Sequence, residues 1–164
     1  MTLDSLDEQS SERFWSKVDR SEDCWIWTGA KSRGYGYFGL RGKWRPAYRV
    51  AYASTVGPIP DGMHIDHMCH TPACVNPAHL RPVTNKENHE NLRGAHRNSK
   101  SGLRGVFWNR RLRKWVAQVT HNYKTQHLGL FDTAEEADAV ARAARARLFT
   151  HSDADMVGDS VEPR

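Results

Sequence analysis

Four residues separate Cys69 from Cys74, and four more separate Cys74 from His79. This spacing constrains the fold of the 164-residue chain more than any other feature of its sequence. Thiolates and imidazoles are the ligands that zinc prefers, and a structural zinc site holds four of them in a tetrahedron. The third cysteine of the chain, Cys24, lies well upstream. We therefore predict that Cys24, Cys69, Cys74 and His79 bind one structural Zn²⁺. Such a site would compensate for a small core, because only 38% of the residues are apolar.

Two alternatives to this zinc site remain open. The three cysteines could be buried free thiols beside an incidental histidine, and His70 could replace His79 as the fourth ligand. An odd number of cysteines favours metal ligation over disulfide pairing. The N-terminus is acidic and lacks the apolar segment of a signal peptide. No apolar run in the sequence is long enough to cross a membrane. We therefore expect a cytoplasmic protein with reduced thiols and no membrane partner.

Local patterns predict strands and helices in the first part of the chain. Residues 1–10 are expected to be disordered, and the threonine and glutamate of Thr84-Asn85-Lys86-Glu87 form a capping-box pattern at the start of a helix. The predicted helices cover residues 11–18, 47–55 and 84–93, and the predicted strands cover residues 24–27, 34–40, 64–68 and 80–83.

A second unit is expected after a linker at residues 95–101. Strands are predicted at 104–109, 114–120 and 124–130, and a second capping box at Thr133 begins a helix that is rich in alanine. We expect Arg142, Arg145 and Arg147 on the solvent side of this helix. The fold class is therefore α+β: a zinc-stapled module at 11–94, a three-stranded antiparallel sheet packed on one helix at 102–150, and a disordered acidic tail at 151–164.

The net charge of +5 is concentrated in one part of the chain. Residues 81–114 contain ten Lys and Arg against two Glu, whereas the segments 1–23 and 151–164 are acidic. A basic stretch of this kind is typical of proteins that bind the phosphate backbone of nucleic acids. The alternative is a solvated charged linker.

Asp66, His67 and Asn88 are candidates for a hydrolytic site. A neutral imidazole can take a proton from water near pH 7, and carboxylate and amide oxygens are suitable ligands for Mg²⁺. Together they fit phosphodiester hydrolysis, with His67 as the base and a divalent metal on Asp66 and Asn88. Adjacent strand residues point to opposite faces, so Asp66 and His67 need a twist or a strand end to share a site. The alternative is a buried histidine beside a surface carboxylate.

These residues also carry a resemblance to a known family. The segments His64-Ile65-Asp66-His67, Cys74-Val75-Asn76-Pro77-Ala78-His79-Leu80 and Val83-Thr84-Asn85-Lys86-Glu87-Asn88 resemble phage HNH endonucleases, and residues 67–88 are also similar to His-Cys box homing endonucleases, both of ββα-metal type. The resemblance implies that His67 is the general base and that Asn88 ligates the catalytic Mg²⁺ (or Mn²⁺). His79 stands where many HNH enzymes have asparagine, which makes it a zinc ligand rather than a catalytic group. Arg49 lies in a segment that resembles the family's His-Arg helix, so it could contact the scissile phosphate. A structural ion pair is the alternative.

The C-terminal segment resembles the AP2 DNA-binding domain. The resemblance rests on Arg104-Gly105-Val106, Lys114-Trp115-Val116-Ala117 and the segment 128–137. It implies that the outer face of a three-stranded sheet enters the major groove. The candidate DNA-binding residues are Arg104, Arg110, Arg111, Arg113, Trp115, Gln118, Thr120 and Lys124. Phe107 and Thr120 replace arginines that are common in plant members, so base specificity cannot be transferred from that family.

The sequence thus predicts a DNA endonuclease of the HNH homing type, with site recognition by an AP2-like domain. By family analogy its products carry 5′-phosphate and 3′-hydroxyl ends. We expect a monomer that acts on double-stranded DNA, in the host cytosol if it is encoded by a phage. The main alternative is a non-enzymatic, zinc-containing DNA-binding regulator; a third is RNA binding or cleavage.

Overall fold

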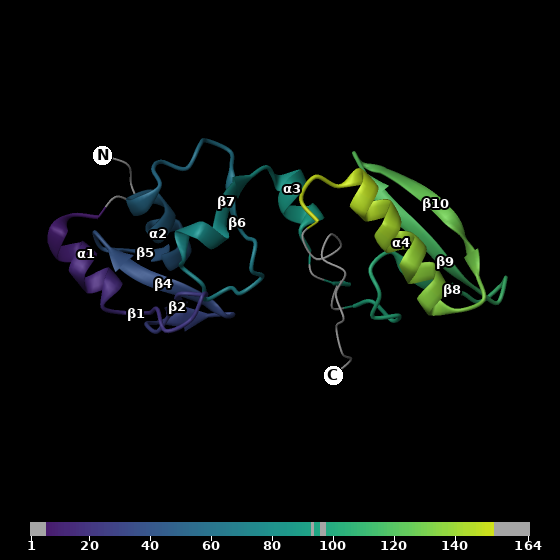
Figure 1. Ribbon diagram of the computed structural model, residues 1–164, viewed down its shortest axis with the longest axis horizontal. Helices are drawn as coiled ribbons and strands as arrows, with labels where there is room; N and C mark the ends of the chain where they lie inside the picture. Colours follow the sequence, from purple (N-terminus) through teal and green to yellow (C-terminus); the bar gives the residue numbers. More distant parts are fainter. Residues whose placement is uncertain (1–5, 93, 96–97, 153–164) are drawn as a thin grey trace. The chain divides into compact units, whose positions relative to one another are not determined.

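The computed structural model describes residues 6–92, 94–95 and 98–152 (Figure 1). The chain divides by its internal contacts into two units, Met1–Asn85 and Lys86–Arg164. The expected linker at 95–101 lies downstream of this boundary. Among the described residues, no helix combines the length and apolar character that crossing a bilayer requires.

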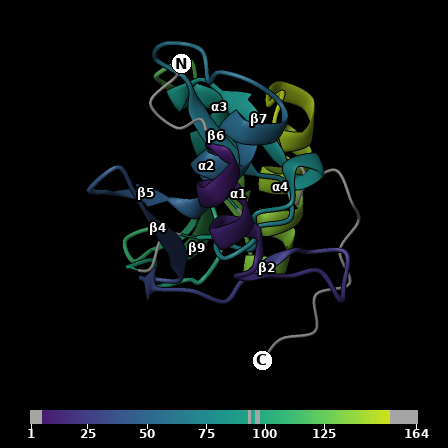
Figure 2. The same ribbon diagram turned by 90° about the vertical axis from the view of Figure 1, so that its left-hand side faces the viewer.

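The first unit contains short strands and two α-helices (Figure 2). Its elements are α1 (Glu8–Trp15), β1 (Val18–Asp19), β2 (Ile26–Trp27), β3 (Lys31–Ser32), β4 (Tyr35–Leu40), β5 (Lys43–Pro46), α2 (Ala47–Thr55), β6 (His64–His67), the 3₁₀ turn η1 (Pro77–His79) and β7 (Leu80–Val83). All strand pairs are antiparallel, in the sheets β1-β2, β3-β4-β5 and β6-β7.

Aromatic residues fill the core of the first unit. Phe14 of α1 lies 4.9 Å from Trp27 and 5.1 Å from Phe38 between ring centroids, and all three are buried. Gly36 passes directly beneath Trp27, where a Cβ atom would come within 2.5 Å of the indole ring. This close approach explains the need for glycine at position 36.

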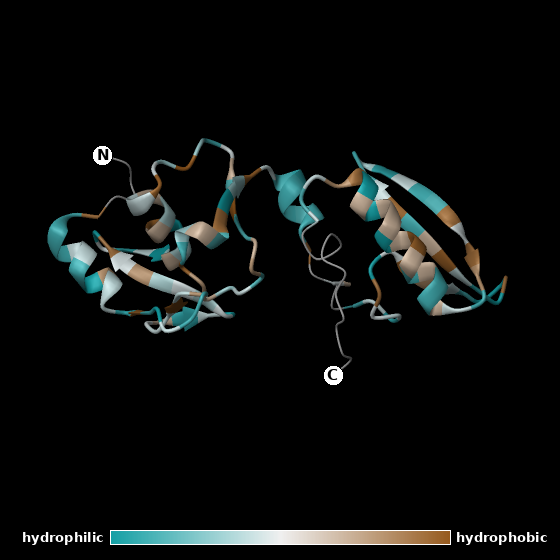
Figure 3. Ribbon diagram, in the orientation of Figure 1, coloured by the Kyte–Doolittle hydropathy of each residue, from teal (hydrophilic) through white to brown (hydrophobic). Residues whose placement is uncertain are grey.

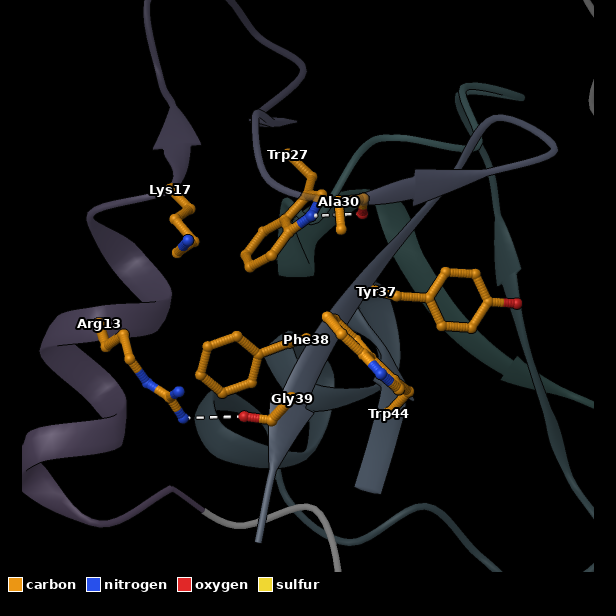
Figure 4. A pocket seen from close by; sticks show the side chains of 8 residues that line it. All are labelled: Arg13, Lys17, Trp27, Ala30, Tyr37, Phe38, Gly39 and Trp44. Atoms are coloured by element: carbon orange, nitrogen blue, oxygen red, sulfur yellow. Dashed lines mark hydrogen bonds between the residues drawn. The ribbon is translucent and has the colours of Figure 1, made fainter. Parts of the chain in front are cut away.

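A cavity of about 370 Å³ opens between α1 and the β4–β5 hairpin (Figure 4). Arg13 crosses it and donates to the Gly39 carbonyl at 2.8 Å, while the Trp27 indole donates to the Ala30 carbonyl at 3.1 Å. The guanidinium carbon of Arg13 also lies 4.5 Å from the centre of the Phe38 ring. The two contacts of Arg13 attach α1 to β4.

The second unit is a three-stranded sheet packed on one helix, as the sequence predicts. Its strands, in the order β10-β9-β8, are β8 (Val106–Asn109), β9 (Lys114–His121) and β10 (Lys124–Phe131). The helix α4 (Ala134–Leu148) packs on the sheet through Ala137 and Ala141. The capping box is confirmed, because Thr133 and Glu136 bond each other's backbone N–H groups.

The short helix α3 (Asn85–Glu90) begins at the unit boundary and is tied to the residues that follow it. It is polar along its length (Figure 3), so tethering bonds rather than an apolar face must stabilise it. Arg104 donates to the carbonyls of His89, Glu90 and Leu92 at 2.8–2.9 Å, which places a cation at the negative end of the helix. The buried Glu90 carboxylate accepts from the backbone N–H of Thr150 at 3.1 Å.

Three sequence predictions about the fold need correction. The helix expected at residues 11–18 begins at Glu8, because the Asp7 side chain caps it by accepting from the backbone N–H of Ser10 at 2.8 Å. Arg145 is buried rather than solvated, and it donates to the Arg104 carbonyl at 2.7 Å. Ser152, expected in a disordered tail, is also buried. The disorder expected for residues 1–5 and 153–164 lies outside the described residues.

Candidate active site and Cys3His cluster

Three cysteines and one histidine from distant parts of the first unit form a compact cluster. The ligand atoms of Cys24, Cys69, Cys74 and His79 all lie within 4.8 Å of one another. The His79 Nδ1 atom is 3.5 Å from the Cys24 sulfur and 3.6 Å from the Cys74 sulfur. This donor set fits zinc, and His79 rather than His70 completes it.

Backbone pairing brings the two halves of the cluster together. β2 runs antiparallel to the loop through an Ile26–Cys74 bridge, in which Trp27 N donates to the Ala73 carbonyl at 2.9 Å. Val75 N donates to the Trp25 carbonyl at 2.8 Å. The cluster therefore joins the N-terminal strands to the cysteine loop, as the sequence predicts.

Two polar residues fix the ligand loop. Asn76 donates to the Asp23 carbonyl at 2.8 Å and accepts from Ala78 N at 3.0 Å, which caps η1 and sets the approach of His79. The second ring nitrogen of His79 faces the Asp23 carboxylate at 3.3 Å. A carboxylate in this position orients the ring so that the other nitrogen faces the metal, as in many zinc sites.

The thiols of the cluster lie where a thiolate needs a compensating charge. Burial raises the pKa of Cys74 to about 12, and it also raises the pKa of Cys24. A divalent cation offsets this penalty because its charge favours the deprotonated ligands. The chemistry of the donor set and the burial of the thiols thus support a metal at this place.

His67 stands at the end of β6 with its ring orientation fixed. Its Nε2 atom lies 3.0 Å from the carbonyl oxygen of Cys74. A carbonyl only accepts, so Nε2 carries the hydrogen and Nδ1 of the neutral ring keeps its lone pair. Burial lowers the pKa of His67 below its usual value of 6.5, partly opposed by the Cys74 hydrogen bond and by the charge of Asp66. The ring is therefore neutral at pH 7 and suited to accept a proton.

Two tyrosines that no sequence pattern assigns to the site flank His67. The Tyr48 ring on α2 packs edge-on against the imidazole at 4.8 Å between centroids, and the Tyr35 ring lies at 6.1 Å. Both tyrosines look like ordinary core or hairpin residues in the sequence. Their packing restricts the imidazole to one orientation.

Asp66 is engaged with an arginine across the β6–β7 ladder. It pairs in register with Arg81, whose Nε and Nη2 atoms approach its Oδ2 atom at 3.2 and 3.1 Å. The ion pair offsets the cost of burying the carboxylate. Asp66 thus lies next to His67 in β6, with an arginine on its Oδ2 atom.

The two other candidates for the catalytic site lie on helices. Asn88 is half-buried on α3, and Arg49 is half-buried on α2, next to Tyr48. Within residues 6–92, 94–95 and 98–152, Arg49 has no ion pair, so the structural alternative for this residue receives no support.

Six of the eight candidate DNA-binding residues divide into two groups. Gln118 and Thr120 share one face of β9, opposite the face of Ala117 and Val119, which pack towards α4. Arg110, Arg111, Arg113 and Lys124 are exposed in or beside the two hairpin turns.

Two of the arginine and tryptophan candidates differ from the expectation. Trp115 packs against the core on the α4 side, because strand alternation sets it on the same face as Ala117. Arg104 is held internally by its three bonds to the end of α3.

Residues 45–90, which include β6, β7 and α3, match the family described as HNH endonuclease. This match supports a nuclease. The chain is also similar to two proteins of Escherichia phage T7: Protein 7.7, with 42% identity over 72 residues, and Protein 3.8, with 35% identity over 77 residues.

These similarities cover only parts of the proteins. The matched segments span 43% and 44% of this chain, and 55% and 63% of the lengths of Protein 7.7 and Protein 3.8, respectively. No solved structure gives a significant match.

Proposed function

We propose that this protein is a metal-dependent DNA endonuclease that hydrolyses phosphodiester bonds with His67 as the general base. The observation that carries the proposal is the hydrogen bond from His67 Nε2 to the Cys74 carbonyl. It leaves Nδ1 of a neutral, immobilised ring as the proton acceptor, within a segment that matches the HNH endonucleases.

The remaining site residues would hold a metal and the phosphate. Asp66 and Asn88 offer the oxygen ligands that Mg²⁺ or Mn²⁺ requires, and Arg49 would contact the scissile phosphate. When bound, the divalent ion stabilises charge on the phosphate and on the leaving 3′-oxygen. His67 would remove a proton from the attacking water as the water oxygen bonds to phosphorus and the bond to the 3′-oxygen breaks. The leaving oxygen takes a proton from solvent, so the products carry a 5′-phosphate and a 3′-hydroxyl. The Cys3His cluster would hold Zn²⁺ separately from this chemistry.

Metal titration tests the assignment of Asp66 and Asn88. Asp66→Asn and Asn88→Ala should each raise the Mg²⁺ concentration for half-maximal cleavage by about 10-fold or more, because outer-shell changes alone cost about 10–100-fold in metal affinity. The matched controls, Asp61→Asn and Asn85→Ala, alter exposed residues and should leave it unchanged. If Asp66→Asn leaves the Mg²⁺ concentration for half-maximal cleavage unchanged, Asp66 does not bind the metal and serves only in its ion pair with Arg81.

The pH dependence follows from the lowered pKa of His67. The neutral ring is the active form, and its pKa lies below 6.5, so cleavage should vary little from pH 7 to 8 and the midpoint of its acid limb should lie below pH 6.5. The check is kcat/KM against pH, with DNA affinity measured at each pH. An acid limb centred above 6.5 would contradict a buried base of this kind.

We further propose that the C-terminal unit recognises double-stranded DNA as an AP2-like domain. The exposed Arg110, Arg111 and Arg113 in the β8–β9 turn and Lys124 in the β9–β10 turn would contact phosphates. Gln118 and Thr120 would face the bases. The similarity to T7 proteins is consistent with action in the cytosol of a bacterial host.

The salt dependence of binding tests this surface. Arg110→Gln combined with Arg111→Gln should weaken DNA binding and reduce the slope of log K against log salt by about 2, because each phosphate contact contributes about 0.9. Arg113 is kept because its backbone is left-handed, with φ 50°. The pair Arg142→Gln and Arg147→Gln on α4 is the matched control. An equal slope change in both pairs would indicate a general effect of charge.

The rival function is a zinc-containing DNA-binding regulator without catalysis. One observation favours it: Asp66 is engaged by Arg81. The regulator hypothesis predicts that the protein binds DNA but does not cleave it with any divalent ion.

A further inference from the structure

One row of apolar side chains crosses the C-terminal sheet. The register aligns Phe107 of β8 with Val116 of β9 and Val116 with Leu130 of β10. Phe107 and Leu130 are 44% and 45% exposed, whereas Val116 between them is only 3% exposed. Phe107 and Leu130 are therefore exposed apolar side chains on either side of the buried Val116.

This row lies on the face of the sheet that α4 does not cover. Val106 and Ala117 pack against Ala137 and Ala141 of α4. Side chains alternate along each strand, so the neighbouring Phe107 and Val116 point to the opposite face. Phe131 packs with the α4 cluster, which places Leu130 on the open face as well.

The surroundings of the row are polar and basic. The next row is Gln118 with His127, followed by Thr120 with Thr125, whose hydroxyls are 2.9 Å apart. The three strands contain no Asp or Glu, the Asp132 carboxylate that follows β10 is paired with Lys114 of β9, and the adjoining β8–β9 turn carries exposed arginines. A partner that binds this surface must therefore match both features: it must be a polyanion, and it must present apolar groups to the row.

Duplex DNA offers one apolar group in its major groove, the C5-methyl of thymine. We propose that Phe107 and Leu130 contact thymine methyl groups, and that this row makes the protein select thymine in its target. The proposal rests on the proposed role of this sheet in DNA binding. Gln118, one row away, can form paired hydrogen bonds to adenine, so the two rows together favour A·T pairs.

Replacing thymine by uracil tests the proposal, because it removes only the methyl group. Bound duplexes are first selected from a random library by the full-length protein in Ca²⁺, which suppresses cleavage. Each thymine of the selected site is then replaced by uracil, and the affinity is measured at fixed salt by fluorescence anisotropy. At one or more positions the affinity should fall about fourfold per methyl, the effect of about 0.8 kcal/mol for a buried methylene-sized group.

Variants assign the effect to the row. Phe107→Ala or Leu130→Ala should bind thymine and uracil duplexes equally at the affected position. Leu112→Ala removes an exposed leucine from the β8–β9 turn of the same sheet and should retain the discrimination.

The outcomes separate this proposal from the proposed function. Tight binding that depends on Arg110 and Arg111 but is indifferent to uracil at every position would overturn the thymine proposal and leave DNA recognition intact. Binding unaffected by the arginine variants would refute the role of the sheet altogether. A concentration-dependent dimer that Phe107→Ala dissociates, without a uracil effect, would assign the row to a second copy of the chain and also overturn the proposal.

Discussion

Replacing His67 by alanine should reduce the rate of DNA cleavage by about 10²–10⁴-fold, the usual contribution of a positioned general base. His67 is the buried imidazole whose Nε2 donates to the Cys74 carbonyl, so the substitution removes the proposed proton acceptor, Nδ1. The measurement is a single-turnover rate at saturating protein. DNA affinity should stay within a few-fold of the wild type.

Two further variants separate catalysis from folding in this experiment. His67→Gln retains a donor near the Cys74 carbonyl, so it should be as inactive as alanine but closer to the wild type in thermal stability. His64→Ala changes an exposed residue of the same strand and should cleave normally. Turnover retained by both His67 variants would transfer the role of base to another residue.

Loss of the zinc site should unfold the first unit. Structural zinc contributes an apparent ~10–16 kcal/mol in small domains, comparable to the whole stability of a typical domain, about 5–15 kcal/mol. Cys74→Ser, in the middle of the ligand loop, should therefore abolish zinc binding and the packing of the buried Trp27. The measurements are zinc content by mass spectrometry and near-UV circular dichroism.

The loop supplies a matched control for the zinc experiment. His70→Asn alters a residue outside the cluster whose backbone is left-handed, with φ 53°, a conformation that asparagine tolerates. It should retain about one zinc per chain and the native fold. A Cys74→Ser protein with native circular dichroism and no zinc would refute the structural role of the metal.

The Cys3His cluster and His67 are connected through one residue. Cys74 contributes its sulfur to the cluster and its carbonyl oxygen to His67. Under the proposed function, zinc binding would fix the peptide that orients the base. The cysteine loop that makes this link lies between β6 and β7.

Features with strong local signals were predictable from the sequence. The bounds of α2, 47–55, and of β7, 80–83, agree with the prediction, because Gly57-Pro58 ends the first and the capping pattern at Thr84 follows the second. The four members of the cluster were also predicted, since even spacing and an odd cysteine count leave few other pairings.

Features that depend on tertiary contacts were not predictable. No pattern indicates that Arg104 caps α3, that Arg145 is buried, or that Arg81 engages Asp66. Each side chain pairs with partners at least 12 residues away, so the local sequence shows only a charged residue. The hydrogen bond from His67 to the Cys74 carbonyl was not predictable either. Its acceptor is a backbone oxygen, which every residue type has, so the sequence does not mark it.

The conversion of supercoiled plasmid DNA by the purified, zinc-loaded protein tests the central claim most directly. Sites from the selected library are placed in the plasmid, and Mg²⁺ is compared with Ca²⁺ and with no added metal. The proposed function predicts open-circular or linear product with Mg²⁺ alone, with ends that DNA ligase can rejoin. Plasmid that is bound by the protein yet remains supercoiled with Mg²⁺ and with Mn²⁺ would contradict a nuclease and identify a DNA-binding regulator.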